Sequence, residues 1–286
     1  MNPASAIPAG AQQAVHEVAP WIERLARLGF LAKAALYMTV GALATCAALR
    51  LFGTPAPMQG KTVGSRGAMG ALLDAPAGHV LLYIISIGLF GYAAWRLIEA
   101  IMDPERHGHD AKGIAMRIRS AAVAVIHVGL GYSALRIAMG HYAAAQDGRQ
   151  SQHWTARALA TPGGKYALYA IAAGLAGYGI YQLYCAAKSK LDKQLSLGSL
   201  SQRAVRWVIG ISRFGIAARG VVFVVTAGLF VKAVRDRNPS DAAGPTRSLR
   251  ELFNWGALPF AFVAVGLIAY GVYQLLDARY RRITVA

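Results

Sequence analysis

Three versions of one ten-residue phrase mark this sequence: GLFGYAAWRL from Gly88, GLAGYGIYQL from Gly174 and GLIAYGVYQL from Gly266. They fall at nearly even intervals, and each lies late in a long apolar run that comes after another apolar run. Self-similarity at a fixed period indicates repeated structural units. The sequence therefore predicts one unit of two apolar segments in three tandem copies.

The composition indicates a membrane protein. The 286 residues are 56% hydrophobic and only 15% charged, and the mean hydropathy is +0.38. A soluble protein carries about a quarter charged residues, whereas six stretches here approach the roughly 20 apolar residues that cross a bilayer as a helix. The expected spans lie near Gly29–Leu51, Val80–Met102, Ile118–Met139, Tyr166–Ala187, Ile209–Ala233 and Ala257–Leu276.

The repeat fixes the expected topology. A unit of two spans enters and leaves the membrane on the same side, so the three copies have parallel orientation around a pseudo-three-fold axis along the membrane normal. We predict an all-α membrane protein with six transmembrane helices in three tandem helical hairpins. The predicted segments are a disordered or interfacial tail (1–20) and three repeats (21–103, 104–192 and 193–286).

The loop inside each repeat has its own pattern. A short mixed segment occurs in each, namely Arg66–Leu73, Trp154–Leu159 and Thr246–Phe253. Arg and Leu in such segments predict one or two turns of helix on the outer membrane surface. A glycine comes after each segment at a fixed distance before the repeated phrase, at Gly78, Gly164 and Gly256.

The net charge of +17 indicates contact with a membrane surface rather than with nucleic acid. Most Lys and Arg lie at span ends, where they set topology and attract anionic lipid. No compact basic domain with interleaved aromatic residues indicates nucleic-acid binding. The positive-inside rule favours a bacterial inner (plasma) membrane protein with both termini in the cytoplasm. The expected partners are anionic lipid headgroups on the cytoplasmic side, and another membrane protein or a second copy.

The sequence resembles a prokaryotic membrane family, domain of unknown function 1206. The likeness runs from Trp21 to Arg282 and is carried by RLGFLAKAALYMTVG from Arg27, SRFGIAARGVVFVVTAG from Ser212 and the three repeated phrases. The resemblance implies three copies of a two-helix module and names no activity. The middle copy, MRIRSAAVAVIHVGLGY from Met116, keeps neither the Arg-x-Gly nor the basic residue after it, so a three-fold basic ring is not predicted.

The repeated phrase supplies the first candidate ligand-facing or lipid-facing residues. Its aromatic and polar positions fall at i, i+3 and i+4, which places each trio on one helix face. Such residues form either an interfacial aromatic belt with helix packing or a ligand pocket. The paired small residues, such as Gly88/Gly91 and Gly174/Gly177, predict close helix packing. The trios are Tyr92, Trp95 and Arg96; Tyr178, Tyr181 and Gln182; and Tyr270, Tyr273 and Gln274.

Charged and titratable residues inside the spans are the other candidates. Lys33 and Arg219 occupy matching places, Glu99 lies at i+3 from Arg96, and Asp277 repeats that spacing after Gln274. They either reach the lipid boundary or line an anion-facing site. His127 lies near mid-membrane and is interpreted as a hydrogen-bonded structural histidine rather than a haem or metal ligand.

No catalytic motif is present, and we expect neither an enzyme nor a cofactor. Two function classes stay open. One is a lipid-binding or membrane-complex assembly protein. The other is a channel or carrier for a small solute or ion along the pseudo-three-fold axis, with polar residues facing that axis. Its candidate residues are Thr39, Thr45, Ser86, His127, Ser133 and Thr226.

Overall fold

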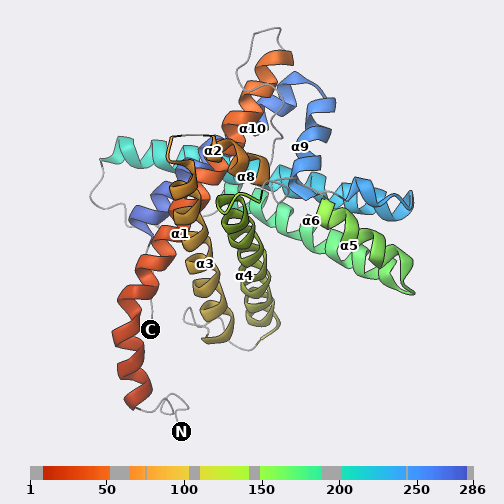
Figure 1. Cartoon of the computed structure of the whole chain (residues 1–286). Helices are drawn as coiled ribbons and strands as arrows, with labels where there is room; N and C mark the ends of the chain where they lie inside the picture. The colour runs from red at the N-terminus through yellow and green to blue at the C-terminus, as the bar shows by residue number, and fades with distance from the viewer. Residues whose placement is uncertain are drawn as a thin grey trace.

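The computed structural model describes residues 9–51, 65–74, 76–102, 110–141, 149–188, 201–242 and 244–281. These residues form helices and turns, with no strand among them, which confirms the all-helical class (Figure 1). The helices are α1 (Ala9–Leu51), α2 (Ser65–Leu73), α3 (Gly78–Met102), α4 (Ala111–Ala138), α5 (Arg149–Ala160), α6 (Gly164–Lys188), α8 (Gln202–Arg235), the 3₁₀ turn η2 (Pro239–Asp241), α9 (Gly244–Asn254) and α10 (Ala257–Tyr280).

Each repeat has a long helix, a short helix and a second long helix. The short helices α2, α5 and α9 include the three segments that the sequence marked as helical. The glycines after them make the turn into the second long helix. A Cβ atom at Gly78 or Gly164 would collide with a carbonyl oxygen of the preceding short helix, and Gly256 has a φ of 120°. This left-handed region favours glycine because it has no Cβ.

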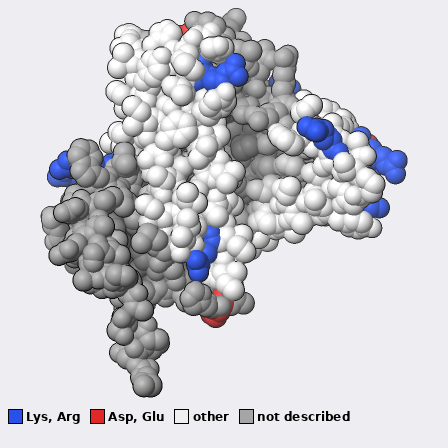
Figure 2. All heavy atoms as spheres, turned by 60° about the horizontal axis from the view of Figure 1, so that its bottom comes forward, with Lys and Arg blue, Asp and Glu red and all other residues white. Residues whose placement is uncertain are grey.

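Five helices are long and apolar enough to cross a membrane: α1, α3, α4, α8 and α10. The sixth stretch, Tyr166–Ala187, forms α6, but this helix is not among the five. Six spans are therefore not confirmed. The face in Figure 2 is mostly uncharged, with Lys and Arg at scattered positions, as suits a surface that contacts lipid.

The long helices form pairs between repeats. The second long helix of one repeat packs on the first of the next, as α3 does on α4 and α6 on α8, and α10 packs on α1. Within repeats, α1 packs on α3 and α8 on α10, whereas α4 and α6 make no extensive contact and diverge in Figure 1. The ring of six long helices is therefore open between α4 and α6.

Small residues explain where helices meet closely. A Cβ at Gly88 would lie 2.8 Å from the carbonyl oxygen of Leu28, and one at Gly266 would collide with Ala218. The expected close packing is present at these two positions. The prediction of close packing is wrong for Gly174 and Gly177, since a Cβ atom there would have no other atom within 4 Å. The reason is that α4 does not reach this face of α6.

The first helix begins earlier than the expected start of the first repeat. α1 begins at Ala9, inside the segment 1–20 expected to be a tail. The sequence there is rich in Ala and Gln, which have high helix propensity. Residues 1–8 lie outside the described residues.

Candidate functional site: a cationic cavity

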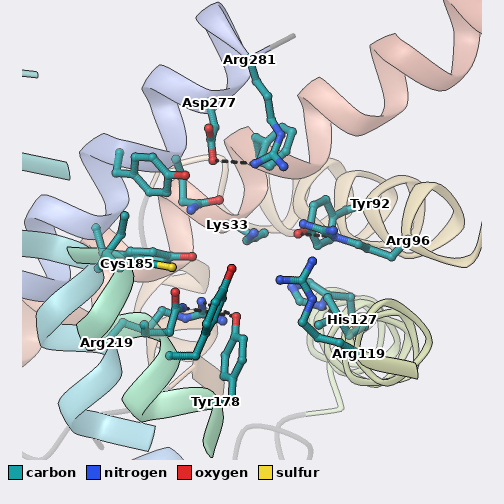
Figure 3. A pocket seen from close by; sticks show the side chains of 18 of the residues that line it. Lys33, Tyr92, Arg96, Arg119, His127, Tyr178, Cys185, Arg219, Asp277 and Arg281 are labelled. Carbon is teal, nitrogen blue, oxygen red and sulfur yellow. Dashed lines mark hydrogen bonds and ion pairs between the residues drawn. The ribbon is translucent and has the colours of Figure 1, made fainter. Parts of the chain in front are cut away.

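A cavity of about 340 Å³ lies where the long helices converge, and all six contribute residues to it (Figure 3). Its lining residues lie around the middles of α1 and α8, between Met116 and His127 of α4, and in the second halves of α3, α6 and α10. This is toward the side of the membrane expected to be cytoplasmic. Its size falls within the range of about 300–1,000 Å³ that is usual for small-molecule sites.

Two arginines fasten neighbouring repeats beside the cavity. Arg27 of α1 donates to the carbonyl oxygen of Ala278 in α10 (2.5 Å), and Arg117 of α4 donates to that of Ala100 in α3 (2.7 Å). Each carbonyl belongs to the last turns of a second helix, where it has no partner within the helix. Ala278 comes directly after Asp277, and Ala100 directly after Glu99, so the two joints correspond in the repeat.

The first corner of the cavity is built on α3. Arg96 pairs with Glu99, as the i+3 spacing predicted, and its Nε donates to the hydroxyl oxygen of Tyr92 (2.8 Å). Ser120 of α4 donates a second hydrogen bond to Glu99 (2.9 Å). Glu99 is only 5% exposed, so its charge is held by partners rather than by water. This corner is electrostatically complete.

The second corner gathers around Arg219 of α8. Its guanidinium donates to the phenol oxygens of Tyr37 and Tyr178, both at 3.1 Å, and Gln182 also donates to Tyr178 (3.2 Å). Four aromatic rings lie within 5.8 Å of the guanidinium carbon. Aromatic faces attract cations but do not neutralise them. No ion pair joins Arg219 to a carboxylate among the described residues.

Lys33 of α1 lies between these corners. Its ammonium is 4.1 Å from the centroid of the Tyr92 ring and 5.3 Å from that of Phe30. The residue is 6% exposed, and the described residues place no carboxylate within ion-pair distance of it. Burial of an ammonium without a counter-charge costs free energy. An anion in the cavity would supply the counter-charge that the described residues do not give Lys33.

The third corner is on α10. Asp277 pairs with Arg281 at 3.5 Å, and both line the cavity. Gln274, one turn before, is buried, and its Oε1 atom has no hydrogen-bond partner among the described residues. A buried acceptor without a donor costs about 1–3 kcal/mol. This amide is a polar group that a donor on a ligand could satisfy.

His127 lies on the cavity wall with its ring 4.7 Å from that of Tyr92. Its Nδ1 is 2.7 Å from the carbonyl oxygen of Val123, consistent with the interpretation of a hydrogen-bonded histidine. The described residues contain no group of three or more His, Cys, Asp or Glu side chains placed to hold a metal ion.

The structure brings together in the cavity lining all the candidate ligand-facing or lipid-facing residues except Trp95, which is buried but does not line the cavity. Of the six polar residues proposed to face a channel axis, only His127 lines it. The others bond to backbone within the bundle, as Ser86 does to the carbonyl oxygen of Gly131. Sequence reasoning missed seven lining residues: Phe30, Met116, Arg119, Val123, Cys185, Ile216 and Arg281.

The lining is strongly cationic. Five cations face two carboxylates, and the carboxylates are held by Arg96 and Arg281. Lys33 and Arg219 point into this space (Figure 3). The structure therefore places both side chains in the cavity lining. Fold and cavity together define a multi-pass helical membrane protein with a polar, cationic interior site.

Comparison with known proteins identifies the family. Residues 28–103, 118–189 and 214–281 each match the family described as Domain of Unknown Function (DUF1206), and this chain belongs to that family. It is also similar to the uncharacterized protein YxxB of Bacillus subtilis (strain 168), with 30% identity over 270 residues, which covers 94% of each chain. No solved structure matches.

Proposed function

We propose that this protein is a six-span protein of the bacterial inner membrane that binds the anionic headgroup of a membrane lipid in its central cavity. The cyclic pairing of α3 with α4, α6 with α8 and α10 with α1 supports three hairpins around a pseudo-three-fold axis. The matching joints of Arg27 and Arg117 support it as well, because each ties a first helix to the end of the preceding second helix.

The excess of positive charge in the cavity carries this proposal. Charges that are removed from water must be paired to avoid a large desolvation cost, and here the carboxylates are already engaged. An anion in the cavity supplies the missing charge. We expect no chemical reaction at the site, since the roles of these residues are fully described by charge, hydrogen bonding and packing.

The opening between α4 and α6 supports a lipid rather than a purely aqueous ligand. In the first and third repeats, whose two long helices pack on each other, Gly88 and Gly266 lie against the first long helix of the same repeat. Gly174, at the same place in the middle repeat, faces open space. A headgroup in the cavity could therefore extend its acyl chains sideways through this opening. The cavity lies on the side of both termini, so the lipid would come from the cytoplasmic leaflet.

The test is lipid retention by the purified full-length protein. Protein in nanodiscs of mixed phosphatidylglycerol and phosphatidylcholine is ejected into a native mass spectrometer, and the retained lipids are counted. We expect retention of phosphatidylglycerol, reduced about tenfold in Lys33→Gln and Arg219→Gln, as loss of one charge-assisted hydrogen bond implies. Lys232→Gln is the control, since Lys232 is 49% exposed beside Asp241. Equal retention of the two lipids by the wild-type protein would overturn the proposal.

A channel or carrier for a small anion is the second candidate. One observation favours it, namely that all six long helices contribute to a single central cavity. The positions of Thr39, Thr45 and Thr226 count against it, because these hydroxyls donate to carbonyl oxygens of their own helices rather than lining a path. Anion flux into proteoliposomes that stops in Arg219→Gln would favour a carrier over a lipid-binding protein.

A further inference from the structure

The unpaired cations of the cavity come one from each repeat. Lys33 lies on α1, Arg219 on α8 and Arg119 on α4, which are the first long helices of the three repeats. Arg119 points toward the same space as Lys33 in Figure 3. Among the described residues, none of the three has an ion-pair partner. The middle repeat therefore does contribute a basic residue, although its sequence did not predict a three-fold ring.

Arg119 takes a different register from the other two. Arg27, Arg117 and Arg213 begin matching segments of the three repeats, and two residues later the chain has Gly29, Arg119 and Gly215. Lys33 and Arg219 come four residues after these glycines, and the equivalent position of the middle repeat is Val123. One helical turn separates Arg119 from Val123, so both are on the same helix face. The basic residue of the middle repeat therefore lies one helical turn earlier than Lys33 and Arg219 do in theirs, and it still lines the cavity.

The same replacement explains the opening between α4 and α6. Gly29 and Gly215 let the backbones of their helices approach Tyr92 and Tyr270 of the partner helix so closely that a Cβ would not fit. A glycine permits such contact because it has no side chain. With Arg119 in that place, α4 cannot close on α6. One substitution thus supplies both a charge and the space beside it.

The phenol groups add donors to the three cations. The hydroxyl oxygens of Tyr92 and Tyr178 accept hydrogen bonds from Arg96 and Arg219. Each phenol also carries its own O–H hydrogen, which can donate to a ligand. Both residues line the cavity. A ligand that accepts several hydrogen bonds and carries more than one negative charge would satisfy these donors together.

We propose that the cavity binds a phosphomonoester, with its three terminal oxygens on Lys33, Arg119 and Arg219 and its ester bond directed away from them. This inference rests on the proposed anion site and specifies its chemistry. A phosphomonoester carries about −1.5 to −2 charge at pH 7 and presents three acceptor oxygens. A phosphodiester such as phosphatidylglycerol has a single charge and two terminal oxygens, so it would leave one cation without a partner.

The experiment compares phosphatidic acid with phosphatidylglycerol for the full-length protein in phosphatidylcholine nanodiscs. Retention is measured by native mass spectrometry for the wild-type protein and for Arg119→Gln. We expect phosphatidic acid to be preferred by about tenfold, as one further charge-assisted contact implies, and the preference to be lost in Arg119→Gln. Arg136→Gln, on the same helix but outside the cavity lining, should keep it.

Each outcome decides a separate point. Equal retention of the two anionic lipids by the wild-type protein would overturn the phosphomonoester and leave the lipid site intact, whereas retention of neither would overturn the lipid proposal. Inorganic phosphate and glycerol 3-phosphate are then tested in detergent by thermal stabilisation. If neither anionic lipid is retained but these soluble phosphates stabilise the protein, the phosphomonoester stands as a soluble ligand and the lipid proposal fails. If neither lipid is retained and the soluble phosphates do not stabilise the protein, both proposals fail. The wild-type comparison needs no variant, so misfolding of Arg119→Gln would not prevent a decision.

Discussion

Arg119 occupies in α4 the place that Gly29 occupies in α1, two residues after an arginine that fastens the helix to the neighbouring repeat. At Gly29 the backbone meets Tyr92 without an intervening side chain, whereas the side chain of Arg119 points into the cavity. A single position therefore distinguishes a closed helix pair from an open one, and the middle repeat is the open one.

We predict that Arg119→Gly allows α4 and α6 to approach each other. Spin labels at Val125 and Ile180, two exposed positions on these helices, should report a shorter mean distance in the variant. Arg119→Gln removes the charge but keeps a long side chain, so it is the matched control and should leave the distance unchanged. An unchanged distance in Arg119→Gly would mean that the side chain is not what separates the helices.

Glu99→Gln should destabilise the protein by about 3–5 kcal/mol, because it leaves the buried guanidinium of Arg96 without its carboxylate. The pair is shielded, with side-chain exposures of 11% for Arg96 and 6% for Glu99. Glu23→Gln is the control, since Glu23 and Arg27 are 41% and 33% exposed, and an exposed pair contributes about 0–1 kcal/mol. The measurement is reversible unfolding in detergent. An equal loss in the two variants would show that the cavity pair is fully solvated.

Phosphate should offset part of the loss in Glu99→Gln. A bound anion would supply negative charge close to Arg96, so the variant should gain more thermal stability from added phosphate than the wild-type protein does. A ligand that binds only the folded state stabilises it by RT ln(1 + L/Kd), where L is the free ligand concentration. The same phosphate series on both proteins checks this, and a smaller gain in the variant would mean that an anion on Lys33, Arg119 and Arg219 does not reach Arg96.

The phenol hydroxyls of the repeated phrase should not be equivalent. Tyr92→Phe and Tyr178→Phe remove acceptors for arginine side chains, and each should cost about 0.5–1.5 kcal/mol. Tyr270→Phe should cost less, because no hydrogen bond of its hydroxyl is found among the described residues. The three unfolding curves are compared in one detergent. If the three Tyr→Phe variants left both stability and anion affinity intact, the tyrosines would be packing residues alone.

Gly174→Ala and Gly88→Ala test the open face of α6. Alanine is favoured over glycine in a helix by about 1 kcal/mol, and the added methyl at Gly174 meets no atom. Gly174→Ala should therefore be neutral or stabilising, and Gly88→Ala should be destabilising because its methyl would press on the carbonyl oxygen of Leu28. Thermal unfolding of the two variants decides the point. A marked loss for Gly174→Ala would mean that α4 and α6 do pack closely in the membrane.

Much of this architecture could be predicted from local sequence pattern. The three phrases predicted the repeats, and the i+3 spacing predicted the pair of Arg96 and Glu99. The short mixed segments before the phrases predicted the helices α2, α5 and α9. Most of the cavity lining was predictable because residues at i, i+3 and i+4 share one helix face. Trp95 is an exception, because the rotation of α3 about its axis decides which of these residues reach the cavity. Packing against the other helices sets that rotation.

The features that sequence reasoning missed depend on contacts between repeats. Arg281 reaches the cavity from the end of α10 because Asp277 draws it inward. Arg119 could have been found by aligning Arg27, Arg117 and Arg213 and comparing the residues two positions after each arginine. That signal was present in the sequence. The opening between α4 and α6 was not predicted, because the close contacts of Gly29 and Gly215 with the partner helices, which Arg119 replaces in α4, appear only in the assembled structure.

Cysteine chemistry offers a direct probe of the charge in the cavity. Cys185 is free and lines the cavity, whereas Cys46 is free and does not line it. A cationic cavity raises the local concentration of anions. A negatively charged methanethiosulfonate should therefore modify Cys185 faster than a positively charged one. The ratio of the two modification rates should be about tenfold if the electrostatic difference is roughly 1.4 kcal/mol. The ratio should shrink in Arg119→Gln, and phosphate should protect Cys185. Cys46, measured in the Cys185→Ser variant, is the control that gives the intrinsic reactivity of the two reagents. An equal ratio of modification rates at both thiols would show that the cavity exerts no positive field.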